Sequence, residues 1–195
     1  MVPSDEELVA AFKRGELVAF DTLVLRWDRK IRGAIYRILG SEDEARDLCQ
    51  EAFLKAYRGL PGFKGEARFS SWLYQIALNL CRDRMRRRKG RTFLSLDDLN
   101  EAEESPQRGP SALDVVESRD LSRTVAEAVA ALPNDQREVI ILKQYQDLTF
   151  LEISTVLGLP PSTVKTRLYR GLLQLRELLE QRGVRGTSPV PAPSP

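Results

Sequence analysis

Histidine is missing from all 195 residues of this chain, and cysteine occurs only twice, at Cys49 and Cys81. Without histidine the chain cannot form the usual Ser-His-Asp catalytic triad. Two cysteines outside a C-x-x-C pattern cannot complete a Cys/His zinc site within one chain. We therefore expect no catalytic residues, no metal site and no cofactor. Each cysteine is interpreted as a small buried hydrophobic residue on a helix.

Long apolar runs are also missing. No run approaches the roughly 18 residues that a membrane-spanning helix needs. Three of the first seven residues are acidic, namely Asp5, Glu6 and Glu7. A secretory signal instead has a basic start followed by an apolar core. We expect no such signal, no membrane insertion and a cytoplasmic location.

Charge is unevenly distributed along the chain, although its net value is only +2. Residues 82–91 hold seven basic side chains and one acidic side chain, whereas residues 92–117 hold seven acidic side chains and one basic side chain. The segment 163–185 is basic again. Two basic segments with an acidic stretch between them predict a polyanionic partner that contacts the chain in two places.

Apolar residues recur every three or four positions along most of the chain, and no stretch of useful length alternates as a strand would. Gly40 and Gly158 are predicted helix ends. Capping residues predict helix starts at Ser4, Ser41, Asn134, Thr149 and Ser162. The sequence therefore predicts an all-α protein.

The chain is predicted to hold two small helical bundles joined by a flexible linker. Residues 91–117 lack helical periodicity and contain proline and glycine. A structureless stretch of this length is unusual inside one compact domain. We predict one bundle at 1–90, an acidic linker at 91–117 that holds the bundles apart, and a second bundle at 118–182. The Pro-rich segment 183–195 is predicted to be a disordered tail.

A helix-turn-helix pattern lies in the second bundle, with a tight turn at Gly158-Leu159-Pro160 between two helices. The second helix is predicted to bury Val164 and Leu168 and to present a polar face. Residues predicted to contact DNA are Ser162, Thr163, Lys165, Thr166, Arg167, Tyr169 and Arg170. Arginine can bond guanine, whereas Ser, Thr and Lys bond either bases or phosphates. The alternative is a polar face that is merely solvated.

A second candidate DNA surface combines aromatic and basic residues in the first bundle. It comprises Phe63, Lys64, Arg68, Phe69, Ser70 and Trp72, followed by Asn79, Asp83, Arg86 and Arg87 on a helix. Aromatic rings can stack on unpaired bases, at roughly 1–3 kcal/mol per base. The alternative is that Phe63, Phe69 and Trp72 belong to the core.

A third candidate surface is a stripe at i, i+3, i+4 and i+7 that faces away from the core. Its residues are Asp47, Gln50, Glu51 and Leu54. A single exposed leucine is common, but a leucine bracketed by acids resembles a face on which another helix docks. A di-metal site would need inward carboxylates and usually histidine, so the sequence favours docking.

The chain resembles a known family in two places. The run Asp47–Phe53, the loop Phe63–Leu73, and Asn79 with Asp83 are similar to region 2 of the sigma-70 family. Residues 132–139 and 149–175 are similar to its region 4. The large region that separates these two in housekeeping sigma factors is missing, so the chain resembles the small extracytoplasmic-function (ECF) sigma factors.

The resemblance implies a sigma factor that directs promoter-specific transcription and has no enzyme activity of its own. The stripe from Asp47 to Leu54 would dock on the coiled coil of the largest subunit of core RNA polymerase. The loop 64–71, with Asn79, Asp83 and Arg86, would read the −10 element of promoter DNA and open it by capturing a flipped base. Residues 162–170 would read the −35 element. An anti-sigma factor is a further implied partner.

Three other classes of protein fit the sequence less well. An ordinary DNA-binding regulator would not need the aromatic loop or the acidic stripe. An enzyme acting on single-stranded DNA is disfavoured because histidine and inward carboxylates are missing. A pure interaction scaffold would not explain two basic segments.

Overall fold

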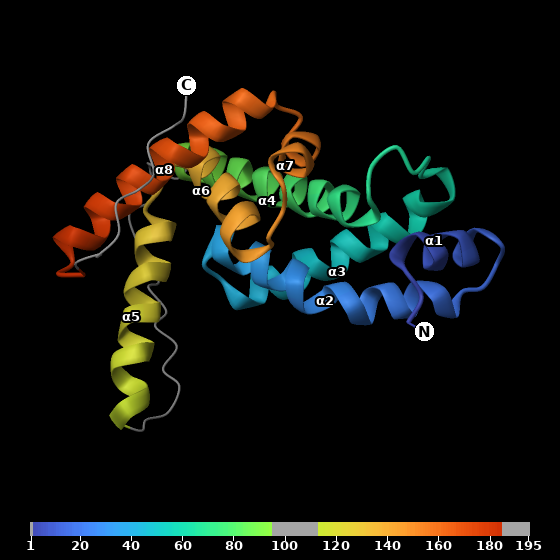
Figure 1. Cartoon of the computed structure of the whole chain (residues 1–195), viewed down its shortest axis with the longest axis horizontal. Coiled ribbons are helices and arrows are strands. Elements are labelled where there is room, and N and C mark those ends of the chain that lie inside the picture. The colour runs from blue at the N-terminus through green and yellow to red at the C-terminus, as the bar shows by residue number, and fades with distance from the viewer. Residues whose placement is uncertain (1, 95–112, 185–195) are drawn as a thin grey trace.

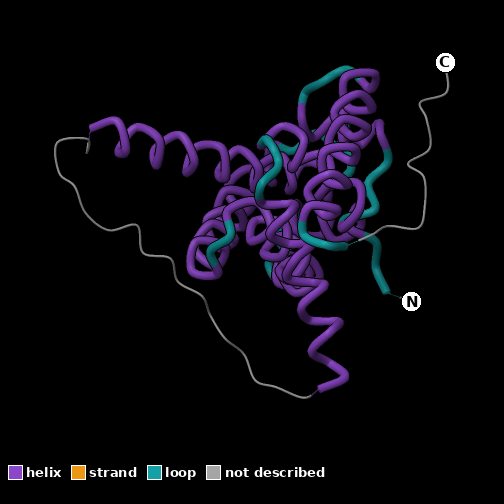
Figure 2. The backbone as a smooth tube through the Cα atoms, turned by 90° about the vertical axis from the view of Figure 1, so that its left-hand side faces the viewer, coloured by secondary structure: helices purple, strands orange, loops and turns teal. Residues whose placement is uncertain are grey.

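The computed structural model describes residues 2–94 and 113–184, and the side chains within 2–88 and 121–184. Within these ranges every regular element is a helix (Figures 1 and 2). The helices are α1 (Asp5–Lys13), α2 (Val18–Leu39), α3 (Glu42–Gly59), a 3₁₀ turn η1 (Leu60–Gly62), α4 (Phe69–Leu94), α5 (Leu113–Ala130), α6 (Asn134–Ile140), a π-helical turn η2 (Ile141–Tyr145), α7 (Phe150–Leu157) and α8 (Pro161–Gln181). The predicted all-α class is confirmed.

Three of the predicted capping residues begin helices as expected. The hydroxyls of Ser4, Ser41 and Thr149 accept hydrogen bonds from the backbone N–H three residues later, at 3.1, 3.4 and 3.2 Å. Such bonds satisfy N–H groups that have no partner within the helix. Gly40 ends α2 in the left-handed conformation, with φ of 75°, which glycine adopts without strain.

Two predicted caps are wrong, because proline rather than a polar side chain precedes both helices. Asn134 is the first residue of α6, after Pro133, and α8 begins at Pro161, after Pro160. The carbonyls of Pro133 and Pro160 accept the first helical hydrogen bonds, at 2.9 and 3.1 Å. The φ of proline suits these positions, so neither helix uses a side-chain cap.

Helices α1 to α4 form the first bundle, with their apolar faces turned inward. The α2 residues Leu23, Ile31 and Ile35 are almost fully buried, as the helical spacing predicted. The carboxylate of Asp5 accepts hydrogen bonds from Arg26 at 2.5 Å and from Trp27 at 3.0 Å. These bonds tie the start of α1 to α2.

Helices α5 to α8 form the second bundle, in which α8 lies across α6 while α5 projects away (Figure 1). Gly171 permits the close approach of α8 to α6. A Cβ atom at this position would lie 2.9 Å from Cδ1 of Ile140 and 3.1 Å from Cβ of Gln136. The contact therefore requires glycine and sets the position of α8 on its neighbour.

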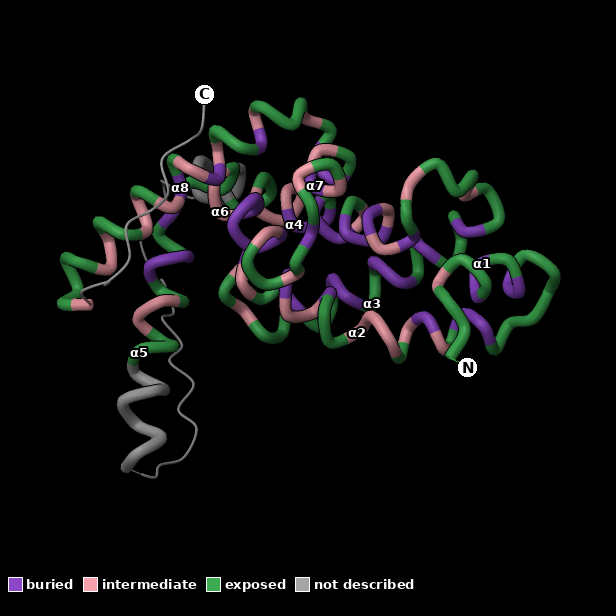
Figure 3. The backbone as a smooth tube through the Cα atoms, in the orientation of Figure 1, coloured by how far each residue is buried: buried purple, intermediate pink, exposed green. Residues whose placement is uncertain are grey.

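The two bundles pack directly against each other, whereas the sequence favoured bundles held apart. Helix α4 contacts α7, and α2 contacts α5, α6 and η2. The buried residues of both bundles belong to one continuous apolar cluster. Figure 3 shows buried residues on α2 and α4 and on α6 and α7, the helices through which the bundles meet. Tyr74 on α4 takes part in both packings, because its ring lies edge-on against Trp27 of α2 and its hydroxyl donates a hydrogen bond to Gln146 of the second bundle.

The helices next to the linker are longer than predicted. Helix α4 runs to Leu94 rather than to about 90, and α5 begins at Leu113 rather than at 118. The rest of the predicted linker and the predicted tail from 185 onward lie outside the described residues. No helix in the described part of the chain is both long and apolar enough to cross a membrane.

Candidate nucleic-acid interface

The helix-turn-helix is held together by local hydrogen bonds. Thr149 and Glu152 form a reciprocal capping box at the start of α7. Burial acts to raise the pKa of Glu152, but hydrogen bonds from the backbone and hydroxyl of Thr149, together with Arg68, lower this pKa overall. Gly158 ends α7 with φ of 65°. This turn directs the chain into α8.

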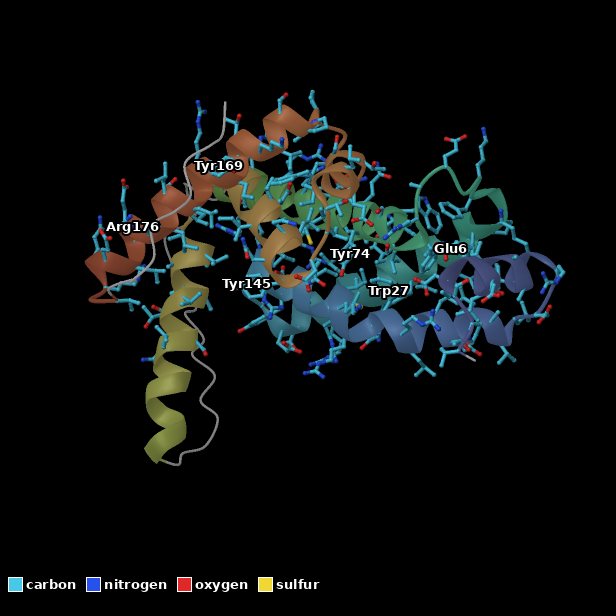
Figure 4. The ribbon with its side chains drawn as sticks, in the orientation of Figure 1. Glu6, Trp27, Tyr74, Tyr145, Tyr169 and Arg176 are labelled. Carbon is cyan, nitrogen blue, oxygen red and sulfur yellow. The ribbon has the colours of Figure 1, made fainter. Side chains whose placement is uncertain are left out.

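Helix α8 has the two faces that its sequence predicted. Val164 and Leu168 are buried against the rest of the bundle. The candidate DNA-contacting residues divide by exposure, with Ser162, Lys165, Thr166 and Arg170 exposed and Thr163, Arg167 and Tyr169 partly buried. All seven candidate side chains are thus at least partly accessible. Figure 4 shows Tyr169 midway along this helix.

Arg167 already has a protein partner. Its Nε atom lies 3.4 Å from Oδ2 of Asp135 on α6. The guanidinium is therefore held beside an acid of its own bundle rather than extended into solvent. Any contact with DNA would have to compete with this pair.

The loop before α4 brings basic and aromatic side chains around a cavity of about 410 Å³ that it shares with α1. Phe63 and Trp72 are partly exposed, and their ring centroids lie 4.9 Å apart. Lys64 and Arg68 are exposed, and Ser70 is partly exposed. All five side chains are at least partly exposed, although the rings of Phe63 and Trp72 also pack against the apolar cluster and Arg68 pairs with Glu152.

The prediction that Phe69 belongs to the DNA-contacting surface is wrong. Its side chain is only 1% exposed and belongs to the apolar cluster. It is the first residue of α4 and points into the bundle, so in this structure it cannot stack on a base. The alternative interpretation, a core residue, is the one that the structure supports for Phe69.

Lys13 on α1 is a loop contact that sequence reasoning missed. Its amino group donates a hydrogen bond to the carbonyl of Phe63 and lies 6.0 Å from the centre of the Phe63 ring. The two residues are 50 positions apart in the sequence. No local pattern could have signalled this contact.

The polar stripe of α4 is accessible along its length. Asn79 is exposed, and its side-chain oxygen accepts a hydrogen bond from Arg82 at 3.4 Å. Asp83 pairs with Arg86 one turn later, and Arg87 is exposed. Asp83 lowers the local positive charge, whereas the arginines provide cations suited to phosphate.

The stripe on α3 faces solvent as predicted. Asp47, Gln50 and Glu51 are exposed, and the side chain of Leu54 is 56% exposed. Glu51 forms only an exposed i,i+4 ion pair with Lys55, at 3.4 Å. Exposed pairs of this kind contribute little to stability, so the stripe is not needed to hold the fold.

The two thiols lie inside the protein. Burial is the main reason that the pKa of Cys49 and that of Cys81 are both raised to about 12. The predicted buried role of both cysteines is confirmed. In the part of the chain that the structure describes, no three acidic or cysteine side chains gather as a set that could hold a metal ion.

The strongest contacts between the bundles also escaped prediction. Glu138 on α6 accepts hydrogen bonds from Nε and Nη2 of Arg82 on α4, at 2.9 and 2.6 Å. Arg68 pairs with Glu152 at 2.9 Å. The sequence did hold a signal for this interface. Helix α4 has one apolar stripe formed by Leu73, Ala77 and Leu80. A separate apolar stripe on the same helix is formed by Tyr74, Leu78 and Cys81.

Comparison with known families gives matches to both bundles. The model for Sigma-70 region 2 matches residues 23–91, and that for Sigma-70, region 4 matches residues 122–175. Helix α1, including Lys13, lies outside both matches.

Similar proteins cover most of the chain. The ECF RNA polymerase sigma factor SigW of Bacillus subtilis is 38% identical over 172 residues, which is 86% of this chain and 92% of SigW. The RNA polymerase sigma-H factor of Pseudomonas aeruginosa is 37% identical over 173 residues, which is 85% of this chain and 89% of that protein.

Two solved structures are similar in fold as well. CnrH in complex with the cytosolic domain of CnrY has a TM-score of 0.69 at 26% identity, covering 92% of this chain and 99% of CnrH. The sigma factor RpoE in complex with the anti-sigma factor NepR from Bartonella quintana has a TM-score of 0.65 at 26% identity, covering 83% of this chain and 96% of RpoE.

Proposed function

Since the chain belongs to the sigma-70 family of RNA polymerase sigma factors, within its ECF group, we propose that three surfaces divide its work. The chain is an alternative sigma factor that binds core RNA polymerase and directs promoter-specific initiation of transcription. In the proposal, α3 docks on polymerase, the loop and stripe of α4 read and open the −10 element, and α8 reads the −35 element.

The observation that carries the docking role is Leu54, an exposed leucine between acids on α3. A leucine that packs on a partner helix loses its water contact on binding, and burial of this kind contributes about 25 cal/mol per Å². Asp47 and Glu51 would face basic residues of the partner, which favours correct orientation during association. The proposed partner surface is the coiled coil of the largest polymerase subunit.

The DNA roles rest on exposed polar side chains. On α8, Ser162 and Lys165 are exposed near the start of the helix, where backbone N–H groups also attract phosphate, and Arg170 is exposed further along it. On the first bundle, Phe63 lines the cavity next to α1, and its ring packs against that of Trp72. Asn79 lies on the neighbouring stripe and could hydrogen-bond an exposed base edge.

We propose that the chain acts without catalysis of its own and works in the cytoplasm, where polymerase and chromosome are found. We also propose regulation by an anti-sigma factor, which is supported by the RpoE–NepR complex among the similar structures. We also propose that residues 1–90 and 118–182 are the two functional bundles, with α4 and α5 extending beyond them to Leu94 and Leu113.

The docking role is tested by Leu54→Glu. We expect the variant to keep its helical circular dichroism but to bind core polymerase roughly tenfold more weakly. The reason is that a charge replaces a leucine that would be buried in the complex. The measurement is pull-down and titration with purified core enzyme. Leu25→Glu is the matched control, since Leu25 is a leucine 84% exposed on α2 of the same bundle. Equal binding by the two variants would refute the α3 docking face.

A further inference from the structure

The loop that precedes α4 makes few backbone bonds of its own. In the described part of the chain its backbone hydrogen bonds lie at its two ends, where Phe63 donates to Leu60 at 3.1 Å and Trp72 donates to Arg68 at 3.2 Å. Between these ends Gly65 has φ of 76°, a conformation that suits glycine. The loop therefore depends on contacts with other elements to keep one shape.

Helix α1 provides such a contact through Lys13. The amino group of Lys13 donates a hydrogen bond to the carbonyl of Phe63 and lies 6.0 Å from the centre of the Phe63 ring. Hydrogen bonds from a charged donor are stronger than those between neutral groups. One side chain thus holds both the backbone and the ring of the residue at which the loop begins.

Lys13 is well placed to hold the loop because the residue before it belongs to the core. Phe12 is only 7% exposed, and its ring centroid lies 5.5 Å from that of Phe20 and 5.2 Å from that of Tyr57. At the other end of α1, Asp5 accepts hydrogen bonds from two side chains of α2. Helix α1 is therefore fixed to the bundle at both ends.

The position of Phe63 also affects that of Trp72. The centroids of these two rings lie 4.9 Å apart. Trp72 is close to the end of α3 as well, because a Cβ atom added at Gly59 would lie 3.1 Å from Cζ2 of Trp72. The pair of rings is thus supported by α3 through Gly59 and by α1 through Lys13.

Helix α1 and the loop share one cavity of about 410 Å³. Glu6 and Lys13 line it from α1, and Phe63, Lys64 and Arg68 line it from the loop. Figure 4 labels Glu6 on this helix. The three loop residues belong to the surface proposed to read the −10 element, whereas α1 lies outside both family matches.

We propose that Lys13 is a positioning residue for the −10 element, which holds the loop 63–68 in the shape that reads the bases without itself contacting DNA. The inference rests on the proposed −10 role of this loop. A loop that must be ordered on binding loses conformational entropy at that moment, whereas a loop that is already fixed binds at less cost. Loss of Lys13 therefore weakens reading of the −10 element and leaves reading of the −35 element unchanged.

Three variants of the full chain test this role. Lys13→Met removes the cation but keeps a long side chain, and Lys13→Arg keeps a charged donor. Arg14→Met is the matched control, because it removes the same charge one residue later from a side chain that pairs with Glu16 and does not line the cavity. Circular dichroism and titration with core polymerase should show that all three variants fold and bind polymerase as the wild type does.

The main measurement is competition binding by each reconstituted holoenzyme. The DNA is a promoter found by sequencing the transcripts that the wild-type holoenzyme makes from genomic DNA, together with its single-base variants. For Lys13→Met we expect the preference for the native −10 element over these variants to fall roughly tenfold, the size of effect expected when a hydrogen bond to a charged group is lost. Its preference at the −35 element should not change. Lys13→Arg and Arg14→Met should behave as the wild type does.

The dependence of binding on salt separates positioning from direct contact with phosphate. A lysine that neutralises one phosphate contributes about 1 to the slope of log affinity against log salt concentration. We expect Lys13→Met to keep the wild-type slope. A slope reduced by about 1, an equal loss with Arg14→Met, or an unchanged preference at the −10 element would each overturn the inference. If the wild type itself shows no preference at the −10 element, the proposed function of the loop fails instead.

Discussion

Arg167 shows how one side chain can serve two partners. In this structure its guanidinium lies beside Asp135, yet its place on the outer side of α8 is the one expected of a base-reading residue. An ion pair that is partly exposed contributes little stability. If Arg167 contacts DNA as proposed, displacing Asp135 from it should cost little.

Replacing Arg167 with alanine should weaken promoter binding by the polymerase holoenzyme at one position of the −35 element. A lost bidentate contact with guanine costs roughly 1–3 kcal/mol at that base pair. Competition binding with each single base change in the element measures this. Arg176→Ala is the control, since Arg176 lies on the same helix and pairs with Glu180. A loss of equal size on every sequence would assign Arg167 to phosphate and contradict base reading.

At the scale of single elements, one residue of the α7 capping box both stabilises the start of the helix and contacts the other bundle. Glu152 bonds the backbone of Thr149, at 2.8 Å, and also pairs with Arg68 of the other bundle. The helix has only eight residues, so it depends on its cap and its packing.

Thr149→Ala should lower the free energy of unfolding by about 1 kcal/mol, because the N–H of Glu152 loses its acceptor. The measurement is urea unfolding at neutral pH. Thr155→Ala is the control on the same helix, because the hydroxyl of Thr155 only donates to the carbonyl of Leu151. Equal unfolding midpoints for the two variants would show that the cap contributes nothing.

The lowered pKa of Glu152 also predicts the direction of a pH effect. Its folded-state pKa lies below the ordinary value of 4.5, so the unfolded chain takes up a proton first as the pH falls. The stabilisation by ionised Glu152 is present above pH 4.5 and is lost as the pH drops through the lowered value. Glu152→Gln should therefore flatten the dependence of stability on pH in this acid range.

Local elements could be predicted from the sequence, whereas contacts between distant elements could not. The capping boxes at Ser4 and Thr149 depend on residues three positions apart, and the buried side of α8 follows from its spacing. The pair of Tyr74 with Gln146 joins residues 72 positions apart. Phe69 was misassigned because an aromatic residue beside basic ones looks alike whether it points into the bundle or out of it.

At the scale of the whole molecule, the packing of the two bundles against each other should make them one unfolding unit. A continuous core means that neither bundle unfolds without exposing the apolar residues at their contact. Cooperative units of a protein usually coincide with such contiguous packed regions.

Calorimetry of the free chain should therefore give a single unfolding transition in the wild type. Glu138→Gln should split it into two, because each bundle then unfolds with its own midpoint. Glu180→Gln, which removes an acid that pairs with Arg176 within α8, should keep the single transition. Two transitions in the wild type would mean that the bundles are energetically independent.

Arg137 affects how fast the contact between α2 and the second bundle can re-form after it has been broken. Its guanidinium donates to the carbonyl of Ile38 at the end of α2, at 2.8 Å, and also to the carbonyls of Ala130 and Leu132 in its own bundle. Release of α2 breaks only the first of these bonds. The side chain therefore stays oriented for recapture, and little conformational entropy is lost on re-docking. We therefore expect the contact between α2 and α6 to re-form quickly whenever it is broken.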